Sequence, residues 1–178
     1  MKAWFQANAP VVRFLVLAGF MYGGWHLVYT HHLRPQTLMD EWVIQQLVDG
    51  TERGLAVLGL PSQAYAQPES HANRVGLKGK AGVKIGEPCD GMDVFALFAL
   101  FIVAFPGSWK HKLWFIPAGV IFLHSANLMR VLVLTIVQGK APEWLDFSHD
   151  YVFKVLMYAL VFGLWYAWTA LTSKSVAT

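Results

Sequence analysis

Charged residues are scarce in this chain, and cysteine occurs once. Asp, Glu, Lys and Arg make up 14% of the 178 residues, whereas hydrophobic residues make up 56%. Soluble domains carry roughly 25% charged residues, so this composition argues against a water-soluble fold. The formal net charge of +3 is too small and too scattered to indicate nucleic-acid binding. A single cysteine excludes an intramolecular disulfide and a multi-cysteine metal site.

Four apolar stretches approach the length of a membrane helix, which needs ~20 mostly apolar residues. They cover about residues 13–33, 89–105, 113–137 and 151–171. The first and third contain no acidic residue, and the second has Asp90 and Asp93 only in its opening turn. The sequence therefore predicts an all-α integral membrane protein with about four transmembrane helices, organised as a single membrane domain over residues 1–178.

Basic residues beside these stretches predict the orientation in the membrane. Short cytoplasmic flanks are enriched in Lys and Arg. The basic flanking residues are Lys2, Arg13, Lys110, Lys112 and Lys174. Both termini are therefore expected in the cytoplasm, and the long loop 34–88 is expected on the outer side.

The long outer loop contains two regular patterns. From Thr37 to about Leu60, apolar residues recur at helical spacing opposite a polar face, which predicts an amphipathic helix on the membrane or over the bundle. Gly50 and Gly54 are expected to weaken or kink this helix. From Val75 to Ile85, apolar residues alternate with lysines and glycines, which predicts a small β-hairpin. Its cations could bind lipid phosphates or an acidic substrate segment, or simply face solvent; they are Arg74, Lys78, Lys80 and Lys84.

Two residues in or beside the predicted membrane helices carry candidate chemistry. Cys89 is expected to open the second helix, where the positive end of the helix dipole favours thiolate, although Asp90 and Asp93 oppose that effect. Arg130 falls inside the third helix. Burying a guanidinium in hydrocarbon costs ~2.5 kcal/mol or more, so such residues usually face the bundle interior and serve a function. The alternative is that Arg130 reaches the outer headgroups.

A histidine in the last outer loop completes the set. His149 stands where this loop enters the fourth helix, and Asp150 beside it could orient the imidazole; a solvated loop histidine is the simpler interpretation. Asn127 lies one helical turn before Arg130 and could orient the guanidinium. The predicted topology brings thiol, guanidinium and imidazole to one side of the bilayer. In thiol chemistry on peptides, imidazole moves the proton and a fixed cation stabilises the oxyanion.

Three short runs resemble the motifs of the exosortase/archaeosortase family in order and spacing: Cys89–Met92, Asn127–Val131 and His149–Tyr151. The likeness is closest in the C-terminal half, and the chain looks like a short, roughly four-helix form of a family whose usual members have eight helices. It implies a cysteine-protease-like transpeptidase that cleaves C-terminal sorting signals through a thioester and transfers the product to an acceptor. The implied location is a bacterial inner membrane, with the active site on the periplasmic face.

The same resemblance implies roles for individual residues and for partners. Cys89 would be the nucleophile, Arg130 the oxyanion or thiolate stabiliser, and His149 the general acid and base, with no metal or cofactor. The expected partners are the lipid bilayer and exported proteins that end in a short motif, a transmembrane helix and a basic tail. Residues expected to support the site or to bind substrate are Asn127, Asp150 and Gly91.

Two non-enzymatic functions remain alternatives. A carrier of haem, quinone or metal could use His26, His31 and His32, which fall near the outer end of the first stretch. Against this, no two histidines stand four residues apart on a predicted membrane helix. An assembly subunit could instead recruit a protein partner through its outer loop. The sequence does not predict the oligomeric state.

Overall fold

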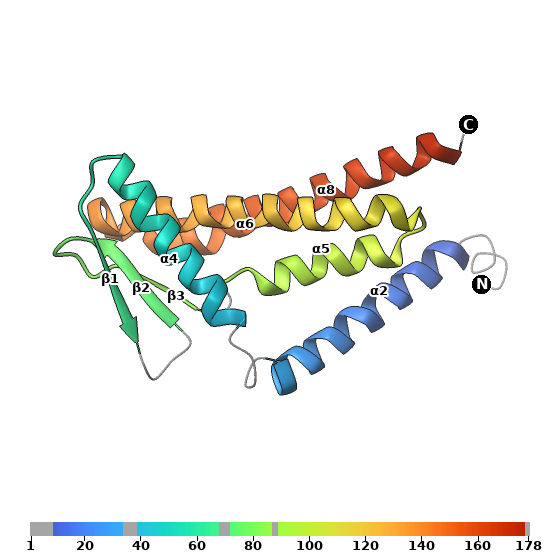
Figure 1. Ribbon diagram of the computed structural model, residues 1–178, viewed down its shortest axis with the longest axis horizontal. Coiled ribbons are helices and arrows are strands. Elements are labelled where there is room, and N and C mark those ends of the chain that lie inside the picture. Colours follow the sequence, from blue (N-terminus) through green and yellow to red (C-terminus); the bar gives the residue numbers. More distant parts are fainter. Residues whose placement is uncertain (1–8, 34–38, 68–71, 87–88, 177–178) are drawn as a thin grey trace.

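A bundle of apolar helices carries a layer made of one helix and a small β-sheet at one end (Figure 1). This computed structural model describes residues 9–33, 39–67, 72–86 and 89–176. The bundle helices are α2 (Ala9–Val28), α5 (Met92–Ala104), α6 (Trp109–Lys140) and α8 (Phe153–Val176). The outer layer contains α4 (Met39–Val57), β1 (Ser62–Gln67), β2 (Ala72–Leu77) and β3 (Val83–Ile85). Short helical turns complete the fold: η1 (Tyr29–Leu33), η2 (Pro142–Trp144), α7 (Leu145–Phe147) and η3 (Ser148–Val152).

Three described segments are long and apolar enough to cross a membrane: Val11–Leu33, Trp109–Lys140 and Pro142–Thr172. The second predicted span, residues 89–105, corresponds to α5, which has only 13 residues. At ~1.5 Å per residue it is about 20 Å long, less than the ~30 Å hydrocarbon core of a bilayer. The prediction of an all-α membrane protein is confirmed, with three full-length candidate spans and one shorter apolar helix.

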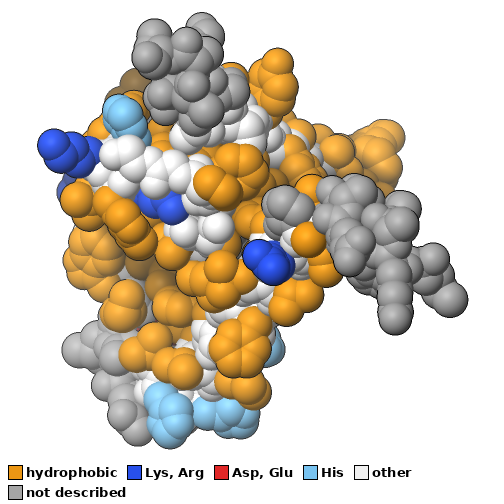
Figure 2. Space-filling view, turned by 90° about the vertical axis from the view of Figure 1, so that its right-hand side faces the viewer, with side chains coloured by type: hydrophobic (Ala, Val, Ile, Leu, Met, Phe, Trp, Pro, Cys, Tyr) orange, Lys and Arg blue, Asp and Glu red, His pale blue; other side chains and the backbone are white. Residues whose placement is uncertain are grey.

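The outside of the bundle is apolar, as a membrane requires. Phe20, Ile121 and Phe162 expose 80%, 66% and 61% of their surface. Soluble monomers rarely expose large continuous apolar patches, whereas lipid is a suitable environment for such side chains. Figure 2 views the end of the bundle opposite the outer layer; Lys and Arg side chains are visible there, and none of the described Asp or Glu side chains is.

The short helix α5 lies at the centre of the bundle, because it contacts α2, α6 and α8. Phe101 of α5 stacks on Trp165 of α8 with ring centroids 4.0 Å apart. At its C-terminal end, the Lys112 ammonium donates hydrogen bonds to the carbonyl oxygens of Val103 and Phe105, at 2.8 and 2.7 Å. A helix end leaves carbonyl groups without intrahelical partners. Lys112 satisfies two of them and so fixes the position of α5 along α6.

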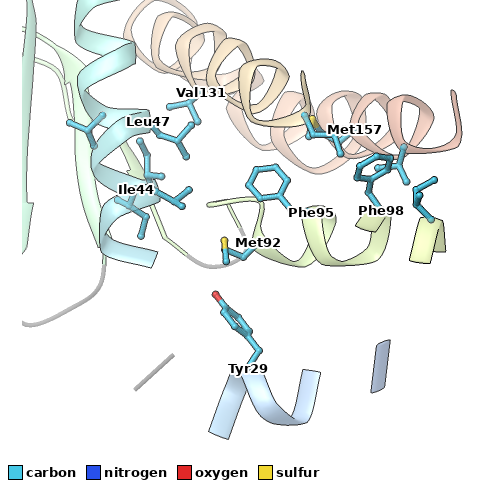
Figure 3. Close-up of a cluster of buried hydrophobic side chains, with 14 of the residues drawn as sticks. Tyr29, Ile44, Leu47, Met92, Phe95, Phe98, Val131 and Met157 are labelled. Atoms are coloured by element: carbon cyan, nitrogen blue, oxygen red, sulfur yellow. The ribbon is translucent and has the colours of Figure 1, made fainter. Parts of the chain in front are cut away.

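The predicted amphipathic helix is confirmed as α4, which packs over the bundle; the predicted first residue, Thr37, lies outside the described residues. α4 continues without interruption through Gly50 and Gly54. A Cβ atom at Gly50 would lie 2.8 Å from Leu128 Cδ1, and one at Gly54 would lie 3.1 Å from Leu132 Cδ1. The two glycines therefore allow α4 to approach two leucines of α6. Figure 3 shows Ile44 and Leu47 of α4 in the buried cluster with Val131 of α6.

The predicted β-hairpin is confirmed, and it belongs to a larger sheet. β2 and β3 pair antiparallel, with Val75 opposite Val83. β1 adds a third strand that the sequence analysis did not predict, with Ser62 opposite Leu77. The Gly82 N–H donates to Oε1 of Gln138 at 3.1 Å, which attaches the sheet to the last turns of α6. Those turns are therefore covered by the outer layer.

The close approach of α4 to α6 gives a stability prediction. Gly50→Val is expected to overpack the contact with Leu128 and to lower the free energy of unfolding by about 1–3 kcal/mol. Thermal unfolding in detergent measures the effect. Gly23→Val on α2 is the matched control, because a Cβ atom at Gly23 meets no atom within 4 Å. Equal losses of stability in the two variants would show that the Gly50 contact is unimportant.

Candidate active site

Cys89 lies in the turn that joins β3 to α5. Its N–H donates to the carbonyl oxygen of Gly86 at 2.5 Å. Gly91, which precedes α5, has φ of +90°, a left-handed conformation that side chains other than glycine rarely adopt. A Cβ atom there would also lie 3.0 Å from Phe95 Cζ and 3.2 Å from Asn127 Nδ2. Backbone conformation and space therefore both favour glycine beside the cysteine.

The structure brings the thiol, the guanidinium and the imidazole together. Cys89 Sγ lies 3.1 Å from Nε2 of His149 and 3.7 Å from Nη2 of Arg130. These residues come from the turn before α5, from η3 and from α6, respectively. Arg130 is only 8% exposed and points into the protein, so it does not reach for the headgroups. The imidazole and the guanidinium therefore both lie beside the Cys89 sulfur atom.

Asn127 connects two of these groups. Its side chain is fully buried, and its Nδ2 donates to the carbonyl oxygens of Cys89 and Asp90 at 2.9 and 3.1 Å. Its Oδ1 accepts a hydrogen bond from Nη1 of Arg130 at 3.3 Å. A buried amide is costly unless its hydrogen bonds are made. Asn127 therefore holds the cysteine turn against α6 and orients the guanidinium beside it.

His149 is oriented by an acidic side chain. Its Nδ1 lies 3.1 Å from Oδ1 of Asp150, and Lys154 Nζ donates to the same oxygen at 2.9 Å. A carboxylate beside Nδ1 favours the tautomer with the proton on that nitrogen. Nε2, which faces the Cys89 thiol, is then free to accept a proton.

The charge state of Cys89 follows from competing effects. Burial raises the pKa of the thiol above its ordinary value. The positive charge and the hydrogen bond of Arg130 lower this pKa, Asp90 raises it, and Lys154 lowers it, but burial has the largest effect. The thiol is therefore protonated near neutral pH. The dipole of α5, expected to favour thiolate, does not prevent this outcome, and the predicted opposing influence of Asp90 is present.

Asp90 also has a structural part in the turn. It is 3% exposed, and its Oδ1 accepts a hydrogen bond from the Met92 N–H at 3.1 Å. This bond satisfies one of the N–H groups that the start of a helix leaves without a partner. Asp90 thus stabilises the beginning of α5 while it disfavours the thiolate form of its neighbour.

All the site residues expected from the sequence lie in this one cluster: Cys89, Gly91, Asn127, Arg130, His149 and Asp150. Lys154 also belongs to the cluster and was not expected from the sequence. Its spacing of four residues from Asp150 is typical of ion pairs on a helix and could have indicated it. The histidines considered for a carrier lie apart, on α2 and η1. Among the residues that the structure describes, no three His, Cys, Asp or Glu side chains gather in a way that could hold a metal ion.

The fold and the cluster together define a membrane-embedded protein with a cysteine, a histidine and an arginine at a shared point. The chain belongs to the transmembrane exosortase family of the EpsH type, whose family model matches residues 33–167. That range includes α4, the sheet and every residue of the cluster. No curated protein and no solved structure matches the chain.

The raised pKa of Cys89 predicts a pH dependence of its reactivity. An ordinary cysteine pKa of roughly 8.5 leaves about 3% thiolate at pH 7, and a raised pKa leaves less. Because thiolate is the reactive form, the rate of alkylation by iodoacetamide should rise with pH through pH 9. Mass spectrometry can measure the rate in detergent, and the label is specific because Cys89 is the only cysteine.

Removing the nearby cation should raise the pKa further. Arg130→Gln is therefore expected to react more slowly than the wild type at every pH below the plateau. Lys110→Gln, at the opposite end of α6, is the control and should react like the wild type. An alkylation rate that is independent of pH between 7 and 9, or faster in Arg130→Gln, would contradict this account of the thiol.

Asn127→Leu keeps the volume of the side chain and removes all three hydrogen bonds. Two backbone carbonyl groups and the Arg130 guanidinium would lose a buried partner, which is expected to cost about 1–3 kcal/mol. The midpoint of thermal unfolding in detergent should fall. The accessibility of Cys89 to alkylation should rise, because the turn is no longer held against α6. Asn73→Leu, in β2 and away from the cluster, should leave that accessibility unchanged, and a similar increase there would contradict the role given to Asn127.

Proposed function

We propose that this protein is a membrane transpeptidase that cleaves the C-terminal sorting signals of exported proteins through a cysteine thioester. The observation that carries the proposal is the position of Cys89 Sγ, 3.1 Å from His149 Nε2 and 3.7 Å from Arg130 Nη2. Membership of the exosortase family supports the same class of enzyme. A nucleophile, a proton-transfer group and an oxyanion-stabilising group are thus present at one point.

We place the site just inside the outer, periplasmic face of a bacterial inner membrane, with both termini cytoplasmic. Eighteen residues of α6 separate Trp109 from Asn127, which is about 27 Å at ~1.5 Å per residue. This length is close to the ~30 Å hydrocarbon core, so Cys89 and Lys110 lie near opposite faces. The cations at the end of the bundle shown in Figure 2 support a cytoplasmic location for that end. Lys2 lies outside the described residues.

The first chemical step forms a tetrahedral adduct between Cys89 and the substrate. His149 Nε2 takes the Cys89 proton as the sulfur attacks the scissile carbonyl carbon. The carbonyl oxygen gains negative charge, and the Arg130 guanidinium stabilises it. Such a donor is typically worth ~3–4 kcal/mol in the transition state. A base within hydrogen-bond distance is needed, because the buried thiol is protonated at rest.

The second stage releases one product and resolves the other. The imidazolium of His149 gives its proton to the departing amine, the C–N bond breaks, and the acyl group remains on Cys89. An acceptor amine, a hydroxyl or water then attacks the thioester carbonyl, and His149 removes the proton of that nucleophile. The sulfur leaves and regains a proton. Asp150 keeps the imidazole oriented and stabilises its charged form throughout.

An apolar cavity beside the site could hold apolar side chains of a substrate helix. Its volume is about 220 Å³, and its lining includes Trp25 of α2, Phe95 and Ala99 of α5, and Val120 of α6. Met92 also lines this cavity and stands three residues after Cys89. A substrate helix with apolar side chains in this cavity would present its outer end to the thiol. Such positioning can lower the barrier by several kcal/mol.

Substitutions in living cells test the proposal. Cys89→Ala and His149→Ala should abolish processing, and an unprocessed precursor should accumulate. Arg130→Ala should slow processing by ~10²–10³, the effect of losing an oxyanion donor. Immunoblots of membrane fractions measure the precursor. A hydroxylamine-sensitive adduct should form only on protein that retains Cys89.

The matched control is His111→Ala, because His111 is exposed at the opposite end of α6. It removes an imidazole without touching the cluster and should process normally. Normal processing in all three cluster variants would refute the enzymatic proposal and leave the carrier or assembly functions.

A further inference from the structure

The strand β3 forms one edge of the outer sheet and leads into the site. The strand order is β1-β2-β3, so within the described part of the chain β3 has a neighbouring strand on one side only. No described backbone group outside the sheet forms a hydrogen bond with Val83–Ile85. Cys89 follows the end of β3 by four residues. A free strand edge carries N–H and C=O groups that can pair with another chain.

The helices cover one face of the sheet. Val75 and Ile85 are fully buried and belong to the same cluster as Leu47 of α4 and Val131 of α6. α6 contacts β3 as well as β2, and its Gln138 accepts a hydrogen bond from the Gly82 N–H just before β3. Lys84, which alternates with the buried residues of β3, is exposed.

The charge of the β2–β3 hairpin is entirely positive. Residues 72–86 contain no acidic residue, and their cations are Arg74, Lys78, Lys80 and Lys84. Arg74 and Lys84 are directly opposite each other across the two strands. Like charges in this position are destabilising. The Nε of Arg74 is also buried and has no hydrogen-bond partner among the described residues. The pair therefore suits an anionic group supplied by another molecule.

We infer that an acidic, extended segment of the substrate, directly ahead of the scissile bond, adds to the free edge of β3 as a fourth strand. This inference rests on the proposed function. Backbone hydrogen bonds to β3 would hold the segment, and one of its carboxylates would lie beside Lys84, on the face that also carries Arg74 one strand further away. Only two residues separate Gly86 from Cys89 in the sequence, so the paired segment ends within a few residues of the bond that is cleaved.

The direction of the added strand follows from the position of β3. Within the outer layer, β3 runs toward the bundle, and Cys89 and α5 follow it in the chain (Figure 1). A substrate whose helix lies in the membrane must also run from outside toward the bundle as it passes the thiol. The added strand is therefore parallel to β3, with the slanted hydrogen bonds of parallel pairing.

Photo-crosslinking to the accumulated precursor tests this arrangement. In cells that make the Cys89→Ala protein, a photoreactive amino acid replaces either Lys84 on the β3 edge or Gln63 on the β1 edge. Gln63 is the matched control, because it is exposed and lies on the opposite edge of the same sheet. A precursor adduct is expected from position 84, and none is expected from position 63. Equal yields at the two positions, or no adduct at position 84, would overturn the inference.

Charge reversal provides a second readout in the active protein. Lys84→Glu should lower the rate of precursor processing about tenfold, the factor that corresponds to about 1.4 kcal/mol. Lys84→Arg should retain the rate. Lys80→Glu, in the hairpin turn away from β3, should have a much smaller effect. Equal losses in Lys80→Glu and Lys84→Glu would show that general surface charge, rather than the β3 edge, determines processing.

The two proposals fail in different ways. If no precursor accumulates in Cys89→Ala cells, the proposed function is wrong, and the strand addition falls with it. If the precursor accumulates but does not crosslink at position 84, the strand addition alone is wrong.

Discussion

The hydrogen bonds of Asn127 are the constraint on which the arrangement of the site depends. One buried amide pairs with the carbonyl oxygens of Cys89 and Asp90 and with the guanidinium of Arg130. Asn127 is fully buried, so separating the turn from α6 leaves several polar groups unpaired at once. The distance between sulfur and guanidinium is therefore fixed by the same contact that holds the start of α5 in place.

Burial and charge act in opposite directions at the thiol. Burial raises the pKa of Cys89 more than the adjacent Arg130 lowers it, and Asp90 adds to the increase. Asp90 remains useful because its carboxylate begins α5 through the Met92 N–H. In the proposed mechanism, a protonated thiol makes His149 necessary as a base, and Arg130 is free to stabilise the oxyanion. The hydrogen bond between His149 and Asp150 then decides which imidazole nitrogen faces the sulfur.

The length of α6 links the membrane part to the outer layer. Its 32 residues exceed the ~20 that a bilayer needs, and its last turns pack against α4 and the sheet. Asn127 and Arg130 lie on the part of α6 where contacts with the bundle give way to contacts with α4. The cysteine turn connects β3 of the layer to α5 of the bundle at the same level, which places the nucleophile between the outer surface and the apolar cavity.

The sequence by itself determined the elements whose signals are local. The length of the apolar runs indicated the membrane helices. Helical spacing indicated α4 and alternation indicated β2 and β3, because each of these two patterns repeats with the period of its own element. Cys89 and His149 were selected by their chemistry at predicted helix starts, and Arg130 by its charge inside a predicted membrane helix. Only the tertiary structure decided the rest. β1 has the run SQAYAQ, whose pairing depends on β2 rather than on its own pattern. Gly50 and Gly54 weaken an isolated helix, and only the tertiary structure shows that Leu128 and Leu132 of α6 pack against them. The charge state of Cys89 depends on burial by residues far along the chain, and no local pattern encodes such contacts.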